Sequence, residues 1–366
     1  MKPYLISIIT ALLLITVSCK QSIDKEAEKK KILNLMESVR EAHFKKDAVL
    51  FFAPNSDSWY DVRKGQVQSV SKADKIDGTQ SYLNNMEFIE LKDTHPPIIE
   101  VSHDGTLASY IGAIVVKGRL NKNPIFWVVS WQSVLKKINN EWKIISTANT
   151  EASAKDASVI LKKAQEAIGI IPQEGTVYAM ADCKGPIGDF KTLLFSGVSD
   201  GRMEQRSVNG HSIRKHGKTN SWTFSVDSQK ENQNPEDFTK YFIKAHEFHW
   251  LSLRPQDRFS NPVFIEFTEF TNRTAFKIRF DDGLGRYAYF YYDFESYLPL
   301  GFESATDSQE NMVKVIFDDW KSLQDTKVFY KLTIEEGDQL WQYNFTDIKI
   351  NTLKKEDFEN RKSYIK

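Results

Sequence analysis

The sequence has few cysteines, no surplus of either charge, and only one long apolar run. It holds two cysteines in 366 residues, which excludes a disulfide-stapled scaffold and a metal site built from cysteine alone. Lysine plus arginine number 49, and aspartate plus glutamate also number 49. A general nucleic-acid-binding protein needs a basic surplus, so no nucleic-acid partner is expected. Beyond its N-terminal segment, the sequence has no apolar run long enough to cross a membrane.

What the sequence does contain is typical of a globular protein rich in aromatic residues. Hydrophobic residues make up 41% and charged residues 27%, which argues against wholesale disorder and against a fibrous repeat. Phenylalanine, tyrosine and tryptophan together make up 13%, and this favours β-sheet. The length exceeds that of one ordinary domain and predicts two or three.

Residues 1–18 have the pattern of a secretory signal. Lys2 provides a short positive segment, and an apolar run follows from Leu5 to Val17. As a helix this run spans about 20 Å, short of the roughly 30 Å bilayer core, so a cleavable signal fits better than a permanent span. The run ends in Ser18 and Cys19, and polar residues follow at once. This junction resembles a bacterial lipobox, although Thr16 replaces the usual leucine.

The lipobox resemblance implies a location and an anchor. In that family a signal peptidase cuts before the cysteine, whose sulfur receives a diacylglycerol that carries acyl chains such as palmitate. We therefore expect lipidation of Cys19 and anchoring in the cell membrane or outer membrane of a Gram-negative bacterium, facing the periplasm or the cell surface. A plain cleaved signal with an unmodified Cys19 remains the alternative. Cys183 would then lack a disulfide partner, and we expect a small buried residue rather than a nucleophile.

Residues 19–150 predict a domain of helices followed by strands. Residues 24–46 place Ile32, Leu35 and Met36 at helical spacing on one apolar face. A weaker helix is expected near residues 79–90. After this helix, apolar residues recur at every second position, a spacing that is typical of β-strands. The expected strands cover residues 97–102, 106–116, 125–131 and 142–146.

This order of elements resembles the nuclear-transport-factor-two-like superfamily, which includes the SnoaL-like cyclases and ketosteroid isomerase. The resemblance rests on a long first helix containing His43, the strand Trp59-Tyr60-Asp61-Val62, a long strand of alternating aromatic residues, and a last strand near residues 140–145. It implies a cone, in which a curved antiparallel sheet wraps around helices and leaves a pocket at the open end.

An isomerase-like reaction in this cone would need a carboxylate base and an oxyanion donor. The catalytic candidates are Asp61 and His43. Trp59 shares a strand face with Asp61, whereas Tyr60 points the opposite way. The competing interpretations are a hydrogen-bonded core histidine for His43 and a strand-end residue for Asp61. Because the superfamily also has many non-catalytic members, an enzyme is the alternative hypothesis.

Residues 151–174 predict a helical linker, and residues 175–355 predict a second domain made mostly of strands. Short turns such as Asp200-Gly201 and Glu336-Gly337 separate alternating runs. One helix is expected over residues 235–248. Many short antiparallel strands with few helices indicate a half-barrel, so the predicted fold class is α+β. Residues 356–366 are expected to form a polar tail.

The second domain resembles the LolA/LolB-like lipoprotein carriers of Gram-negative envelopes. The resembling features are the aromatic run at residues 287–294, a strand ending in Asp319-Trp320, and a last strand ending in residues 348–351. Ser322-Leu323 stands where that family usually has a Gly-Ile-Phe-Pro-like segment. The resemblance implies a half-barrel that binds acyl chains under a helical lid. Its ligand-binding candidates are Tyr289, Tyr291 and Trp341, joined by Trp59 and Trp127 in the first domain. Ordinary core filling is the competing interpretation.

His246 and His249 are three residues apart, but the sequence shows no third metal ligand beside them, so neither a metal nor a cofactor is expected. The sequence therefore predicts a non-catalytic, lipid-anchored envelope protein. It would bind an apolar small molecule, a lipid or a partner protein. A homodimer is left open, and an isomerase-like enzyme is the alternative.

Overall fold

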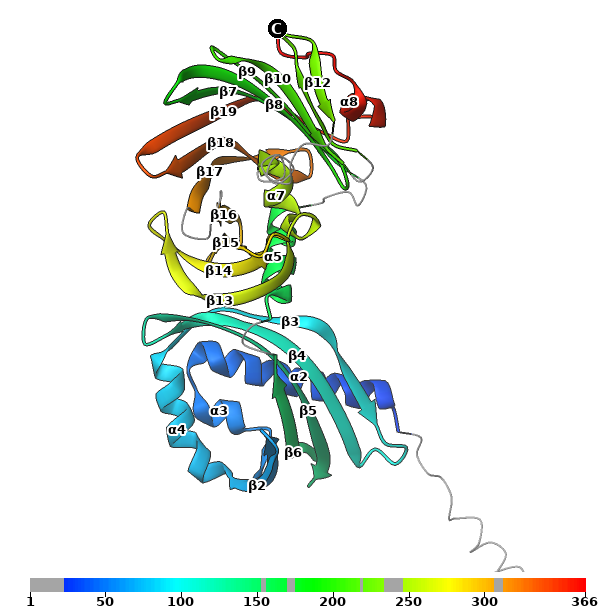
Figure 1. Cartoon of the computed structure of the whole chain (residues 1–366). Helices are drawn as coiled ribbons and strands as arrows, with labels where there is room; N and C mark the ends of the chain where they lie inside the picture. The colour runs from blue at the N-terminus through cyan, green and yellow to red at the C-terminus, as the bar shows by residue number, and fades with distance from the viewer. Residues whose placement is uncertain (1–22, 153–155, 170–174, 218–219, 234–245, 306–311) are drawn as a thin grey trace, which may run out of the picture. The chain divides into compact units, whose positions relative to one another are not determined.

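The computed structural model describes residues 23–152, 156–169, 175–217, 220–233, 246–305 and 312–366. The chain divides into two compact units, residues 1–153 and 154–366 (Figure 1). Each unit combines a mainly antiparallel sheet with a few helices, so the predicted α+β class is confirmed. None of the helices in these ranges combines the length and apolarity needed to cross a bilayer.

Within the described residues, the first unit is a six-stranded sheet with three helices. The helices are α2 (Lys25–Lys45), α3 (Ala48–Phe52) and α4 (Lys72–Asn85). The strands are β1 (Asn55–Arg63), β2 (Gln66–Ser71), β3 (Met86–Val101), β4 (Leu107–Leu120), β5 (Asn123–Ile138) and β6 (Glu141–Glu151). They lie in the order β2-β1-β6-β5-β4-β3, and β1 pairs with β6 in parallel.

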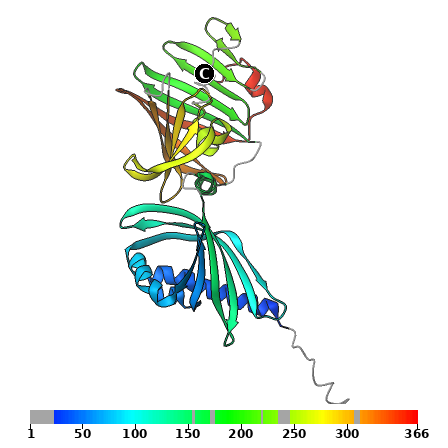
Figure 2. The same cartoon turned by 60° about the horizontal axis from the view of Figure 1, so that its bottom comes forward.

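Helix α2 supplies the core of the first unit. The Asp24 carboxylate caps the helix by accepting a hydrogen bond from the Ala27 amide at 3.0 Å. The predicted apolar face, with Ile32, Leu35 and Met36, packs against one side of β3 to β6. Figures 1 and 2 show α2 lying along the inner side of this curved sheet.

The middle of the first unit differs from the sequence prediction. The second helix ends at Asn85 rather than near residue 90, and β3 begins directly at Met86. Strand β3 then continues through Pro96 and Pro97, where its register with β4 is irregular. Proline is tolerated in this position because β3 lies at the sheet edge and carries bulges.

The second unit contains a 13-stranded sheet within the described residues. The strands are β7 (Thr176–Gly185), β8 (Gly188–Gly197), β9 (Gly201–Ser207), β10 (Gly210–His216), β11 (Trp222–Ser225), β12 (Lys230–Gln233), β13 (Ser260–Phe270), β14 (Arg273–Asp281), β15 (Tyr287–Asp293), β16 (Pro299–Ala305), β17 (Met312–Leu323), β18 (Thr326–Glu336) and β19 (Gln339–Ile350). Their order is β12-β11-β10-β9-β8-β7-β19-β18-β17-β16-β15-β14-β13, and every neighbouring pair is antiparallel.

Few helices accompany this sheet in the ranges that the structure describes. They are α5 (Ser158–Ile168), α7 (Phe248–Leu253), the short 3-10 helix η1 (Pro255–Asp257) and α8 (Lys355–Glu359). Figure 1 shows the sheet curving around α7. Most of the helix predicted at residues 235–248 lies outside the described residues.

Residues 356–366, which we expected as a polar tail, pack against the second sheet. Phe358 and Ile365 are buried against Leu193 and Phe195 of β8. Tyr364 packs against the same cluster, with its ring centroid 5.4 Å from that of Phe195, and the segment also makes polar contacts. A local hydropathy pattern gives little sign that the segment is packed.

Candidate functional site

His43 lies in an aromatic cluster near the end of α2. Its ring meets those of Phe51 and Phe88 edge to face, with centroids 4.9 and 5.2 Å apart. Its Nδ1 donates a hydrogen bond to the Val39 carbonyl oxygen at 2.8 Å. Burial lowers the pKa of His43. These contacts match a hydrogen-bonded core histidine that is uncharged at neutral pH.

Trp59 and Asp61 lie on the inner face of β1. Tyr60 between them is 59% exposed, whereas Asp61 is 4% exposed, as strand alternation requires. The Asp61 carboxylate forms an ion pair with Arg63. Trp59 packs on Phe52, with ring centroids 5.5 Å apart.

The two catalytic candidates are not joined. The rings of Phe51 and Phe52, 4.8 Å apart, link the His43 contact to the Trp59 contact. No hydrogen bond connects His43 with Asp61 in the described part of the chain. Catalysis by His43 and Asp61 stays a prediction, because the structure does not bring the two side chains into contact.

A row of polar side chains crosses the inner face of the first sheet. The register places Asp61 beside Thr147, Thr147 beside Ser133, and Ser133 beside Tyr110. The Ser133 and Thr147 hydroxyl oxygens are 3.3 Å apart. The sequence analysis missed Thr147, Ser133 and Tyr110. Their only signal was the period-two pattern of β4 to β6, which shows a face but not what it covers.

An ion pair from α2 lies near this row. Arg40 Nη2 donates to Asp93 Oδ1 at 2.6 Å. Burial and the neighbouring Asp93 carboxylate raise the pKa of Tyr110 to about 12. Trp131 lies 5.9 Å from Tyr110 between ring centroids, and Trp127, four residues earlier in β5, is 38% exposed. The face therefore offers hydroxyl donors and aromatic surface.

Aromatic rings line the inner face of the second sheet. Phe290 stacks on Phe302 at 5.1 Å, and Phe317 stacks on Phe329 at 4.5 Å between ring centroids. Phe302 and Phe317, 6.0 Å apart, connect the two stacks. These rings form a continuous apolar surface across β15 to β18.

Helix α7 is packed into this aromatic surface. All six of its residues are buried. The His249 ring stacks on Phe329 at 4.1 Å, and its Nε2 donates to the Phe329 carbonyl oxygen at 2.9 Å. Burial lowers the pKa of His249 to about 4. A void beside Trp250 measures only about 10 Å³, room for about one water molecule.

The candidate metal pair does not form a metal site. His249 uses its Nε2 for the sheet, as described above, and His246 contacts the Phe248 ring at 5.3 Å. The ranges that the structure covers contain no group of three or more histidine, cysteine, aspartate or glutamate side chains arranged to hold a metal.

A buried ion network holds both ends of the α7–η1 segment. Glu247 directly precedes α7, and Arg258 directly follows η1. Glu247 Oε2 accepts from Arg258 Nε at 2.6 Å and lies 2.8 Å from His216 Nε2. Arg258 Nη1 also donates to the Val198 carbonyl oxygen at 2.8 Å. Burial acts to raise the pKa of Glu247, but Arg258 and His216 outweigh it and lower the pKa to about 2.

The ligand-binding candidates of the second unit occupy both sheet faces. Tyr289 and Tyr291 alternate with Phe290 and so lie on the outer face, opposite α7. Tyr291 stacks on Phe270 at 4.1 Å. Trp341 lies on the same face as Tyr343, which contacts Phe248 of α7 at 5.5 Å. Of these three candidates, only Trp341 lies on the inner face; binding by any of them stays a prediction.

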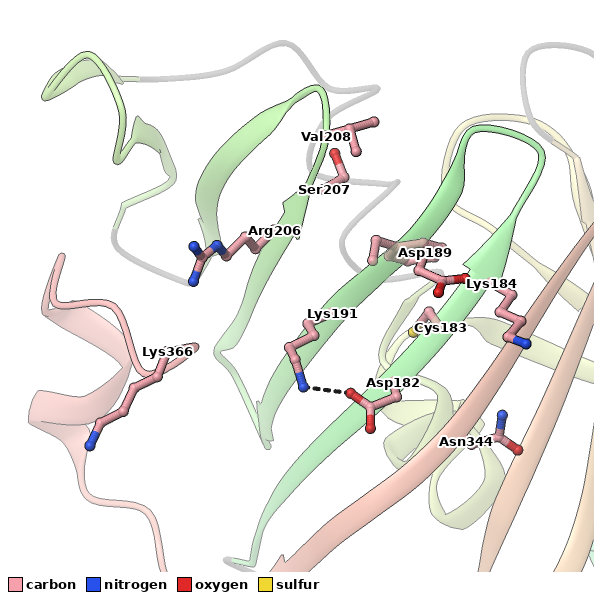
Figure 3. Close-up of a pocket in the computed structure, with 11 residues that line it drawn as sticks. Asp182, Cys183, Lys184, Asp189, Lys191, Arg206, Ser207, Val208, Asn344 and Lys366 are labelled. Carbon is pink, nitrogen blue, oxygen red and sulfur yellow. Dashed lines mark hydrogen bonds and ion pairs between the residues drawn. The ribbon is translucent and has the colours of Figure 1, made fainter.

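A shallow cleft of about 630 Å³ opens on the second sheet (Figure 3). It is lined by Asp182, Cys183, Lys184, Asp189, Phe190, Lys191, Arg206, Ser207, Val208, Asn344 and Lys366. Lys191 Nζ and Asp182 Oδ1 form an ion pair at 2.6 Å across it. Burial raises the pKa of the Cys183 thiol to about 12, so this cysteine is not a nucleophile at neutral pH.

No family model matches the chain. No curated protein matches it either. Solved structures that resemble parts of it include a LolA-superfamily protein from Nitrosomonas europaea, with 12% identity, 55% of this chain and 96% of that chain covered, and a TM-score of 0.40. Another is a nuclear-transport-factor-two-like protein from Cytophaga hutchinsonii, with 18% identity and a TM-score of 0.28. The match covers 33% of this chain and 96% of that chain.

A ketosteroid isomerase-like protein from Erwinia carotovora atroseptica shows 14% identity and a TM-score of 0.29. The match covers 34% of this chain and 95% of that chain. At these identities and scores, the similarities describe partial likeness of fold and say nothing about activity.

Proposed function

We propose that this chain is a lipid-anchored protein of a Gram-negative cell envelope that binds an apolar small molecule or lipid without changing it chemically. The observation that carries the proposal is the aromatic inner face of the second sheet, which is covered by the short helix α7. Aromatic and aliphatic surface with a few polar groups is the usual lining of a site for apolar ligands.

The position of α7 supports ligand exchange. Its side chains Phe248, Trp250, Leu251 and Leu253 occupy the space that an acyl chain would fill. Burying each such side chain contributes about 1.5–3 kcal/mol. An apolar ligand of similar area would replace those contacts with the sheet, so the cost of moving α7 would be offset by ligand binding. In this structure, α7 covers the aromatic face.

The membrane anchor rests on the lipobox pattern. Cys19 lies outside the described residues, so the proposal depends on the order Val17-Ser18-Cys19 at the end of the apolar run. Two or three acyl chains would hold the protein stably at a membrane, because each buried methylene contributes about 0.8 kcal/mol. A partner protein or a second copy of the chain is the competing occupant in place of a lipid.

Native mass spectrometry tests the binding proposal. The soluble Cys19→Ser chain is purified from its own envelope fraction and weighed before and after organic extraction. We expect an added mass that extraction removes. A bare mass, together with no binding of a fluorescent fatty acid at micromolar concentration, would contradict the proposal.

The polar row in the first unit favours a second candidate function. Asp61 could act as a base for proton abstraction next to a carbonyl, with Tyr110 as the oxyanion donor in place of His43. The assay is isomerisation of a β,γ-unsaturated ketone by the wild-type chain and by Asp61→Asn. Equal rates in the two chains would remove this candidate.

A further inference from the structure

Three ionisable side chains are fully buried on the outer face of β9 and β10. Arg202, Glu204 and Lys215 are each 0% exposed, and residues 359–366 lie over them. Charged side chains are almost never fully buried unless they are paired, because removing them from water costs several kcal/mol. Their partners in this chain come chiefly from that terminal segment.

Glu204 binds the backbone of the terminal segment. Its Oε2 accepts from the Tyr364 amide at 3.1 Å, and its Oε1 accepts from the Ile365 amide at 3.1 Å. The Ser363 hydroxyl donates to Oε1 at 2.6 Å, and His211 Nε2 lies 2.8 Å from the same atom. One buried carboxylate therefore holds two successive peptide N–H groups, a contact that does not depend on which side chains follow them.

Arg202 binds the same segment from the other side. Its Nη2 donates to the Lys362 carbonyl oxygen at 2.8 Å. The guanidinium lies between the Phe195 and Tyr364 rings, 4.8 and 5.2 Å from their centroids. Its Nε and Nη1 are buried without a hydrogen-bond partner among the described residues. The terminal segment therefore leaves two buried donors unsatisfied, which is costly.

The surface continues beyond the terminal segment. Ile365 packs on Leu193 and Phe195. In the register of β8 and β9, Leu193 pairs with Glu204, and the next pair on the same face is Lys191 with Arg206. Those two side chains and Lys366 line the cleft of about 630 Å³ (Figure 3). A longer segment could therefore follow the same face past residue 366.

We propose that this face of β8 to β10 is a binding groove for an extended peptide of a partner protein, and that residues 360–366 are its resident occupant. The groove recognises two consecutive backbone amides through Glu204 and a carbonyl through Arg202, with an aromatic ring over the guanidinium. A partner segment that adds an acceptor for Nε or Nη1 of Arg202 satisfies donors that the resident segment leaves open, and can displace it. This groove lies on the sheet face opposite α7, so it is independent of the proposed lipid site.

Fluorescence anisotropy with a labelled ten-residue peptide of sequence 357–366 tests the groove. It is titrated with the soluble Cys19→Ser full chain, and with that chain also carrying either Ile365→Asp or Tyr364→Ala to weaken the resident segment. Because the resident competes with the peptide, we expect at least tenfold tighter binding to the weakened chains than to the intact one.

Changes in the peptide test the contacts without altering the protein. Methylation of the amide nitrogens at Tyr364 and Ile365 removes both donors to Glu204, and we expect at least tenfold weaker binding. A Lys362→Ala peptide is the matched control, because it keeps the carbonyl and loses only an exposed side chain. It should bind as the unmodified peptide does.

Two results would overturn the proposal. One is the absence of saturable binding to folded weakened chains, or equal binding of the methylated and unmodified peptides. The other is dimerisation of the intact chain by exchange of terminal segments, measured by light scattering after size-exclusion chromatography. That result would make a second copy, rather than a partner protein, the occupant of the groove.

Discussion

Buried carboxylates join elements that are far apart in the sequence. Glu28 of α2 accepts from Trp142 Nε1 of β6 at 2.7 Å and pairs with Lys137 of β5 at 3.0 Å. Glu247 connects α7 with β10 and with the residue after η1, and Glu204 connects β9 with the terminal segment. In each case one acceptor satisfies several donors at once, so its removal leaves more than one buried polar group unpaired.

Replacing Glu28 should destabilise the first unit. Glu28→Gln removes the charge but keeps the side-chain size, and it places an amide group against donors that need acceptors. We expect a loss of about 2 kcal/mol in the free energy of unfolding at pH 7. Urea denaturation measures it. Glu26→Gln is the matched control, because Glu26 lies in the same helical turn and is exposed.

The effect of Glu28 should also depend on pH. Burial acts to raise its pKa, but hydrogen bonds from Lys31, Lys137 and Trp142 outweigh burial and lower the pKa from 4.5 to about 2. A lowered pKa in the folded state stabilises the fold above about pH 4.5, and that stabilisation is lost as the pH falls toward 2. The difference in the free energy of unfolding between wild type and Glu28→Gln should therefore shrink as the pH falls from about 4.5 to about 2. A constant difference would contradict this assignment.

Single residues show how far the sequence could predict the sites. The side-chain alternation at Trp59, Tyr60 and Asp61 follows from strand geometry alone, and the structure has it. Arg202 and Glu204 could not be recognised in the same way. Their alternation resembles that of a solvated strand, and they are buried because a segment about 160 residues later in the chain covers them. A local pattern carries no information about such a cover.

Elements were predicted best where local signals agreed. The first helix, expected over residues 24–46, is observed as α2 from Lys25 to Lys45, because its cap, its apolar face and its lack of glycine and proline point the same way. The sequence singles out no strand over residues 201–216, where β9 and β10 lie, because their inner-facing and outer-facing residues do not differ clearly in polarity. The spacing of apolar residues therefore predicted whether a segment is a helix or a strand. The prediction failed where buried charged residues take the place of apolar ones.

The α7–η1 segment should depend on its ion network. Arg258→Ala leaves Glu247 buried without its arginine partner, and breaking a buried ion pair costs about 3 kcal/mol or more. We expect that loss in the free energy of unfolding of the second unit, together with stronger binding of a fluorescent fatty acid, because α7 would be held less firmly. Gln256→Ala, an exposed position in η1, is the control. A loss of stability without any change in fatty-acid binding would mean that α7 does not cover the ligand site.

At the scale of the whole molecule, each unit has its own core. The first unit is built around α2 and the second around the aromatic inner face, so each has the buried apolar surface for its own unfolding transition. We expect calorimetry of the soluble Cys19→Ser chain to show two transitions. Glu28→Gln should shift only one of them and Arg258→Ala only the other. A single transition that both variants shift would mean that the units unfold together.

The position of the whole molecule in the cell should depend on one sulfur atom. If Cys19 carries acyl chains, the wild-type protein partitions into the detergent phase of a Triton X-114 separation and incorporates labelled palmitate. Cys19→Ser should move it to the aqueous phase and abolish the label, because this substitution removes the sulfur that would carry the lipid. Cys183→Ser is the matched control, since Cys183 is buried in the second unit and should leave both readouts unchanged. Retention of the label in Cys19→Ser would contradict lipidation at this residue, whereas an unlabelled wild-type protein would favour a plain cleaved signal.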